Sequence, residues 1–111
     1  MKTLREYKVS LKKCTPGEHA VDLDDPNVHG LRTKLGGEPD WEQSDDHPEC
    51  SCYRKMTFIA QIDSVEHDSK HNPHRIDAIK GGQDYMFGDV GMIYVFFCFD
   101  CLETRSVFQC S

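Results

Sequence analysis

The sequence lacks the long apolar run that a transmembrane helix needs. Its longest uninterrupted apolar stretch, residues 92–99, has eight residues, whereas a helix that crosses a bilayer takes ~20. The first eight residues scatter charges where a secretory signal has an unbroken apolar stretch. We therefore expect no membrane span, no membrane partner and a cytoplasmic location.

Motifs of common catalytic sites are also missing. The chain has no Gly-x-Ser-x-Gly nucleophile elbow and no Walker phosphate loop. Residues with metal-ligand side chains do occur within one stretch, namely Asp63, His67, Asp68, His71, His74 and Asp77. No clear helix places these histidines on one face, and Asn72-Pro73 interrupts the stretch, so a solvated polar loop is favoured over a catalytic zinc site. We expect a binding protein rather than an enzyme.

Basic residues are scarce in the middle of the chain. The 111 residues include 13 Lys plus Arg against 19 Asp plus Glu, a net charge of −6. Residues 15–52 alone hold ten acids and only two bases, Arg32 and Lys34. A negative surface repels nucleic-acid phosphates and anionic lipids. The composition therefore predicts no direct nucleic-acid contact and favours a basic protein as the partner.

The acidic stretch supplies the candidate partner-binding residues. A solvated face is the simpler explanation of such acids, but ten acids against two bases exceed what solubility requires, which favours a docking surface. Trp41 lies among them, either as part of the core or as an interface anchor. The candidates are Asp22, Asp24, Asp25, Glu38, Asp40, Trp41, Glu42, Asp45 and Asp46.

No segment shows a sustained helical period, and no linker or repeat divides the chain. We expect a single domain over residues 1–111 that is mainly β, α+β at most, with a small antiparallel sheet and long loops. Four stretches are predicted as strands, because their polar and apolar residues alternate or because they are rich in apolar and β-branched residues. Two shorter stretches are predicted as single helical turns. The strands are expected at residues 7–12, 56–63, 92–99 and 104–110, and the turns near residues 31–35 and 75–80.

Four of the six cysteines form two close pairs. Cys50-Ser-Cys52 precedes the strand at 56–63, and Cys98-Phe-Asp-Cys101 ends the strand at 92–99. If these strands are antiparallel neighbours, the four thiols converge and form a structural zinc site with four cysteine ligands. The alternatives are unrelated thiols, disulfides in an exported protein and, less favoured, a redox pair of Cys98 with Cys101.

The other two cysteines, Cys14 and Cys110, have no neighbour of their kind in the sequence. A small, weakly polar thiol is most often buried, so each is expected as a buried residue of a strand.

Three passages together resemble a known family. They are Leu35-Gly-Gly-Glu-Pro-Asp-Trp-Glu-Gln43, then Cys50-Ser-Cys52 leading into residues 55–63, then residues 91–98 with Cys101. They look like the YwqG-like bacterial family of unknown function, over roughly residues 31–110. The first two also resemble the programmed cell death protein 2 family, which shares the Gly-Gly-x-Pro-x-Trp motif and paired cysteines.

The resemblance implies a protein-binding role. Small relatives in this family are associated with bacterial toxin systems as immunity proteins, and the eukaryotic relatives bind a ribosomal protein. The hypothesis is an immunity protein that neutralises a cognate toxin, a basic nuclease, through its acidic surface. The alternative is a zinc-stabilised chaperone-like module that shields a basic client.

Overall fold

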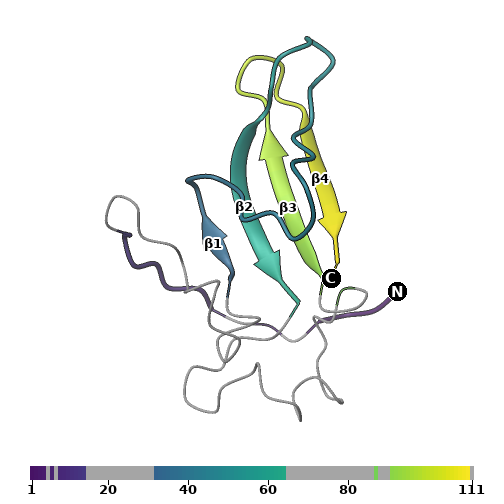
Figure 1. The fold of residues 1–111 in the computed structure, drawn as a ribbon. Coiled ribbons are helices and arrows are strands. Elements are labelled where there is room, and N and C mark those ends of the chain that lie inside the picture. Colours follow the sequence, from purple (N-terminus) through teal and green to yellow (C-terminus); the bar gives the residue numbers. More distant parts are fainter. Residues whose placement is uncertain (5, 7, 15–31, 65–86, 88–90, 111) are drawn as a thin grey trace.

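The computed structural model describes residues 1–4, 6, 8–14, 32–64, 87 and 91–110. Within these residues there is no helix, and four strands form one antiparallel sheet in the order β1-β2-β3-β4 (Figure 1). Among these residues, no helix is long and apolar enough to cross a membrane. The strands are β1 (Lys34–Leu35), β2 (Thr57–Asp63), β3 (Met92–Phe97) and β4 (Thr104–Gln109).

The three longer strands confirm the predicted ones to within two residues at each end. β2 and β3 pair antiparallel, from Thr57 with Phe97 to Asp63 with Met92, and a register shift falls between Phe58 and Ala60. β3 and β4 pair without interruption, as a hairpin. The neighbouring antiparallel arrangement on which the cysteine prediction depends is therefore confirmed.

Two other predictions of local structure were wrong. Residues 8–14 contain no strand, and Val9 and Leu11 are exposed at 75% and 73%. Lys34 and Leu35, expected in a helical turn, form β1 because they pair with Gln61 and Ala60. Alternating polar and apolar residues are compatible with a β-strand, but the strand forms only when its backbone pairs with a neighbouring strand. The turn expected at residues 75–80 lies outside the described residues.

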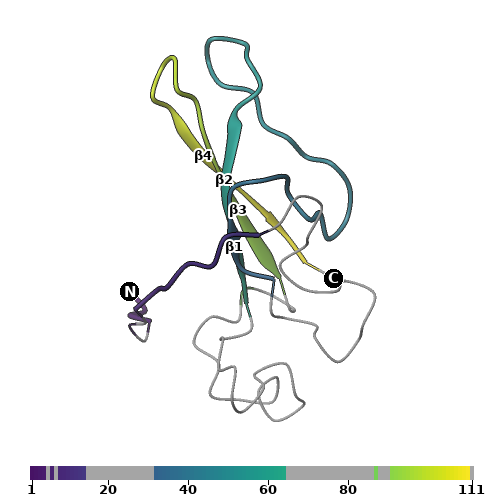
Figure 2. The same cartoon turned by 90° about the vertical axis from the view of Figure 1, so that its left-hand side faces the viewer.

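The sheet has two unlike faces. On one face Phe58, Tyr94 and Phe96 are buried, and Trp41 packs against them from the loop that follows β1; we call this the Trp41 face. Figure 2 shows this loop passing over one side of the sheet only. Because side chains alternate along paired strands, the other face carries the remaining positions. This uncharged face consists of Leu35, Thr57, Ala60, Ile62, Ile93, Val95, Phe97, Thr104, Ser106 and Phe108.

A glycine lets the end of β4 approach the start of β3. A Cβ on Gly91 would lie 2.4 Å from the ring of Phe108 and 2.4 Å from the carbonyl oxygen of Phe87. The Gly91 N–H donates to that carbonyl at 2.9 Å. Only glycine fits this close approach of backbone and aromatic ring.

Candidate metal centre

Two short turns at one end of the sheet carry the paired cysteines. The first turn precedes β2, and its Cys50 N–H donates to the Arg54 carbonyl at 3.1 Å. The second joins β3 to β4, and its Cys98 N–H donates to the Glu103 carbonyl at 2.9 Å. In each turn, the residue after the second cysteine has a left-handed backbone, with φ of 62° at Tyr53 and 64° at Leu102. The two segments, residues 50–54 and 98–103, are thus similar knuckles despite their different cysteine spacing.

The four predicted cysteines converge, as the sequence spacing indicated. The Sγ atoms of Cys50, Cys52, Cys98 and Cys101 all lie within 4.8 Å of one another. Cys98 Sγ is 3.4 Å from Cys50 Sγ and 3.7 Å from Cys52 Sγ. Four thiolates at ~2.3 Å around a tetrahedral ion would be about 3.8 Å apart. The cluster is therefore compatible with a structural metal site.

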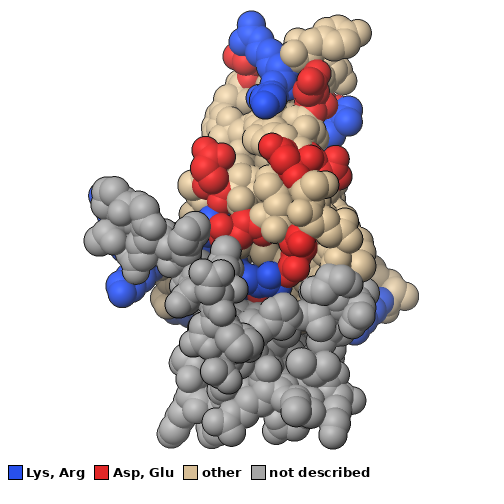
Figure 3. All heavy atoms as spheres, in the orientation of Figure 1, with Lys and Arg blue, Asp and Glu red and all other residues tan. Residues whose placement is uncertain are grey.

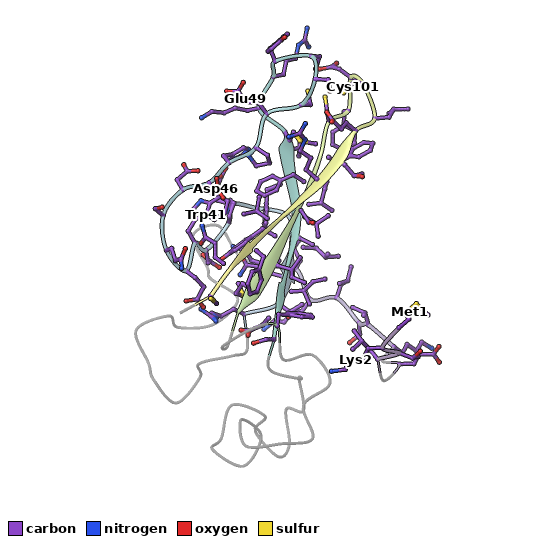
Figure 4. The ribbon with its side chains drawn as sticks, turned by 90° about the vertical axis from the view of Figure 1, so that its right-hand side faces the viewer. Met1, Lys2, Trp41, Asp46, Glu49 and Cys101 are labelled. Atoms are coloured by element: carbon purple, nitrogen blue, oxygen red, sulfur yellow. The ribbon has the colours of Figure 1, made fainter. Side chains whose placement is uncertain are left out.

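The cluster is continuous with the hydrophobic core. Cys50 and Cys98 are buried, at 4% and 3% exposure, and belong to the same cluster as Met56, Phe58 and Phe96. Cys52 and Cys101 lie nearer the surface. Figure 4 shows Cys101 at the outer end of the sheet. A bound ion would thus be covered by protein on its inner side.

The contact between the two cysteines of the first knuckle changes their acidity. Cys50 Sγ and Cys52 Sγ are 2.7 Å apart and share a hydrogen bond. This hydrogen bond lowers the pKa of Cys50 to about 6 and raises the pKa of Cys52 to about 12. The contact therefore favours the thiolate of Cys50, the form in which cysteine binds metals.

Polar contacts hold the knuckles together in addition to the thiols. The Ser51 N–H donates to Glu103 Oε2 at 2.8 Å, and this bond lowers the pKa of Glu103. Arg54 and Asp100 form an exposed ion pair of 2.7 Å between the knuckles. The sequence reasoning missed these cross-linking contacts, because nothing near the cysteines distinguishes such residues from ordinary surface charges.

The remaining cysteines lie apart from the cluster. All six cysteines are free thiols, so the structure holds no disulfide. Cys14 is exposed and outside the sheet, so the expectation of a buried strand residue was wrong there. Cys110 follows β4 directly and is half-buried.

The predicted partner-binding acids separate into three groups. Asp22, Asp24 and Asp25 lie outside the described residues, as do the histidines at 67, 71 and 74. Glu38, Asp45 and Asp46 are exposed on the loop that crosses the Trp41 face, where Figure 3 shows acidic side chains across the middle of the molecule. Asp40 and Glu42 instead form internal ion pairs, which gives them a structural role that the sequence reasoning did not foresee.

The internal ion pairs lie under the loop. Asp40 Oδ2 is 3.0 Å from Lys34 Nζ, and Glu42 pairs with Arg32, which also donates to Asp63 Oδ2 at 3.0 Å. The side chains of Asp40 and Glu42 are 8% and 9% exposed. The two bases of the acidic stretch are thus paired with neighbouring acids, and the exposed charges of residues 36–49 are all acidic.

Trp41 is a packing residue of this loop. Its ring lies 4.7 Å from that of Tyr94 and 6.0 Å from that of Phe96, measured between centroids. Trp41 is half-buried and packs against the core. This agrees with the prediction that Trp41 is part of the core. Figure 4 shows it on the same side of the sheet as Asp46.

Side chains of three adjacent strands hold the backbone of the loop. Gln61 Oε1 in β2 accepts the Asp40 N–H at 2.9 Å, and Tyr94 Oη in β3 accepts the Glu42 N–H at 3.0 Å. Gln109 Oε1 in β4 accepts the Gln43 N–H at 3.0 Å. The sequence reasoning missed this anchoring of the loop. The available signal was Gln61, a lone glutamine among apolar strand residues, which is fully buried. A buried amide requires hydrogen-bond partners.

Comparisons with known proteins give no relative. No protein-family model, no curated protein and no solved structure matches this chain. The resemblance to the YwqG-like and programmed cell death protein 2 families therefore stays a prediction, and the function must be argued from the residues themselves.

Proposed function

We propose that the four clustered cysteines hold one structural zinc ion. Thiolates are soft ligands that suit zinc, and four of them in a tetrahedral arrangement leave no open position for a substrate. The ion would join the segment before β2 to the turn after β3, where Cys50 and Cys98 are 48 residues apart in the sequence. For a small domain, the free energy of metal binding contributes directly to folding.

Metal analysis of protein purified without a histidine tag tests this proposal. We expect one zinc per chain, and cobalt substitution should give the intense charge-transfer absorption of a thiolate-bound ion. Replacing Cys52, the more exposed thiol of the first knuckle, by serine should abolish stoichiometric binding. Cys14→Ser is the matched control, because Cys14 lies outside the cluster. A metal content near zero in the unsubstituted protein would contradict the proposal.

We further propose that the domain neutralises a toxic effector, a basic nuclease, by binding it as an immunity protein. The observation that carries this proposal is the acidic loop fixed on the Trp41 face. Three strands hold its backbone at Asp40, Glu42 and Gln43, so its exposed carboxylates are ordered before any partner arrives. A preorganised surface loses less conformational entropy on binding.

Charge supports a basic partner for this loop. Glu38, Asp45 and Asp46 are exposed, and the chain as a whole carries −6. Nucleases are basic where they bind phosphates, and an acidic protein can occupy such a groove and associate quickly through long-range attraction. The zinc ion has no role in catalysis in this proposal; it stabilises the domain that presents the loop.

Co-expression with the product of the neighbouring gene tests the immunity role. The expected result is a stable complex that removes the toxicity of that product and weakens as salt is raised. The double substitution of Asp45 and Asp46 by lysine should slow association at least about tenfold. Asp100→Lys makes the same type of charge change at the knuckles, away from the loop, and should leave association nearly unchanged.

Other results would redirect the proposal. A complex that is insensitive to both salt and the double substitution would place the interface elsewhere. Recovery of a ribosomal or other basic client, with no toxin neutralised, would favour the chaperone-like alternative.

A further inference from the structure

The four clustered cysteines differ in their access to solvent. Each knuckle contributes one buried thiol, Cys50 at 4% exposure and Cys98 at 3%. Of the other two cysteines, Cys101 is the more exposed. The Sγ atom of Cys52 contacts two other sulfurs, at 2.7 Å from Cys50 Sγ and 3.7 Å from Cys98 Sγ. A small oxidant in solution therefore reaches the cluster most directly at Cys101.

The second knuckle keeps its two cysteines together by its own backbone. Cys98 and Cys101 have the C-x-x-C spacing that is typical of reactive cysteine pairs. The Leu102 N–H donates to the Cys98 carbonyl at 2.8 Å, and the Cys98 N–H donates to the Glu103 carbonyl at 2.9 Å. The first knuckle is held to this turn through the thiols and through exposed side-chain contacts, which add little stability. Cys98 is therefore the thiol whose place beside Cys101 depends least on a metal.

We infer that Cys101 and Cys98 form a site of reversible oxidation by hydrogen peroxide, and that its oxidation releases the zinc ion. The inference rests on the zinc proposal above, in which the four cysteines are thiolate ligands. The Cys101 thiolate attacks one peroxide oxygen, the O–O bond breaks and hydroxide leaves, so the sulfur is oxidised to a sulfenic acid and the peroxide is reduced. The Cys98 thiolate then attacks that sulfur, the S–O bond breaks, a second hydroxide leaves and a disulfide forms.

The disulfide removes two of the four ligands. Cys50 and Cys52 alone do not complete a tetrahedral site, so the chain loses the ion together with the stability that the ion provides. The loop on the Trp41 face keeps its hydrogen bonds to the three longer strands. Oxidation therefore acts on the knuckle end, and a thiol reductant with added zinc restores it.

Peroxide treatment of the zinc-loaded full chain tests the inference. Trypsin cleaves after lysine and arginine, which leaves the two knuckles on separate peptides, residues 35–54 and 81–105. The expected result is release of the zinc, followed with a metal-sensitive dye, as peptide 81–105 becomes lighter by two hydrogen atoms under non-reducing conditions. Dithiothreitol with added zinc should reverse both changes.

Two variants with one histidine ligand separate the knuckles, because zinc also binds to sites with three cysteines and one histidine. Cys101→His removes the attacking thiol and should slow zinc release by peroxide at least about tenfold. Cys52→His is the matched change in the first knuckle. It keeps the reactive pair and should release zinc about as fast as the unsubstituted protein. The zinc content of each variant is measured before peroxide is added.

Each outcome decides the inference. Zinc that is retained in peroxide would overturn it, as would zinc released without a disulfide inside peptide 81–105 or at equal rates from the two histidine variants. If a histidine variant binds no zinc, the peptide analysis of the unsubstituted protein decides alone. Absence of zinc before peroxide is added would contradict the zinc proposal itself, so the two failures are distinguishable.

Discussion

The knuckle end and the acidic loop are held to the same sheet by different forces. At the knuckles, two pairs of thiols converge from segments 48 residues apart in the sequence, and exposed ion pairs such as Arg54 with Asp100 add little stability. Along the loop, Trp41 packs on two aromatic rings, and three buried or half-buried side chains bond the backbone. With the proposed zinc ion bound, the knuckle end would depend on that metal, whereas the loop depends on the hydrophobic core.

The largest expected effect removes a buried thiol from the knuckle end. Cys98→Ser should abolish metal binding and lower the free energy of unfolding by about 4 kcal/mol or more, because metal binding is coupled to folding. Denaturant unfolding with and without a chelator measures this. Cys110→Ser, next to β4 but outside the cluster, is the control and should keep its metal. If the chelator leaves the stability of the unsubstituted protein unchanged, the contrast between the two regions fails.

Trp41→Ala tests the other region. Loss of its ring from between the loop and the core should cost about 3 kcal/mol in urea unfolding, at the lower end for a large aromatic because Trp41 is half-buried. Zinc content should stay the same, since Trp41 lies away from the thiols, and Trp41→Phe should recover part of the stability. Loss of zinc in Trp41→Ala would mean that the two regions are coupled.

The sequence predicted the cysteine cluster better than the loop, and the reason is physical. β2 and β3 show apolar patterns over six or more residues, and their antiparallel pairing, together with the turn at residues 50–54, brings Cys50 and Cys98 together. The ion pairs of Asp40 and Glu42 depend instead on the path of a loop rich in proline and glycine, which no periodicity encodes. The strand predicted at residues 7–12 was wrong for a related reason. Alternating polarity specifies which side chains a strand would place on each face, but not which sheet edge it would pair with.

Tyr94→Phe tests how much the Tyr94 hydroxyl contributes to the stability of the loop region, and how this contribution depends on pH. Tyr94 Oη accepts from the Glu42 N–H and donates to the Asp40 carbonyl at 2.7 Å. Its removal should therefore cost about 1–2 kcal/mol at neutral pH. Burial raises the pKa of Tyr94 to about 12, above its ordinary value of 10.0. The protonated hydroxyl therefore stabilises the fold fully below its ordinary pKa, and this contribution is lost as the pH rises toward the folded-state value.

Unfolding midpoints between about pH 8 and pH 11.5 measure that difference. The unsubstituted protein should lose stability more steeply above about pH 10 than Tyr94→Phe, so the gap between them should narrow. Lysines and thiols titrate in both proteins and cancel in the comparison. Parallel curves over the whole range would show that the hydroxyl is not held in the way that its two contacts indicate.

The smallest expected effect returns to the knuckles. Tyr53 and Leu102 occupy left-handed positions, where a side chain costs energy that glycine avoids, although both chains are exposed at 88% and 70%. Leu102→Gly should therefore stabilise the zinc-loaded protein by about 1 kcal/mol, read from denaturant unfolding. Phe99→Gly, an exposed residue of the same knuckle without a left-handed backbone, should be neutral or destabilising. If both substitutions destabilise equally, the Leu102 side chain contributes more to the knuckle than its exposure suggests.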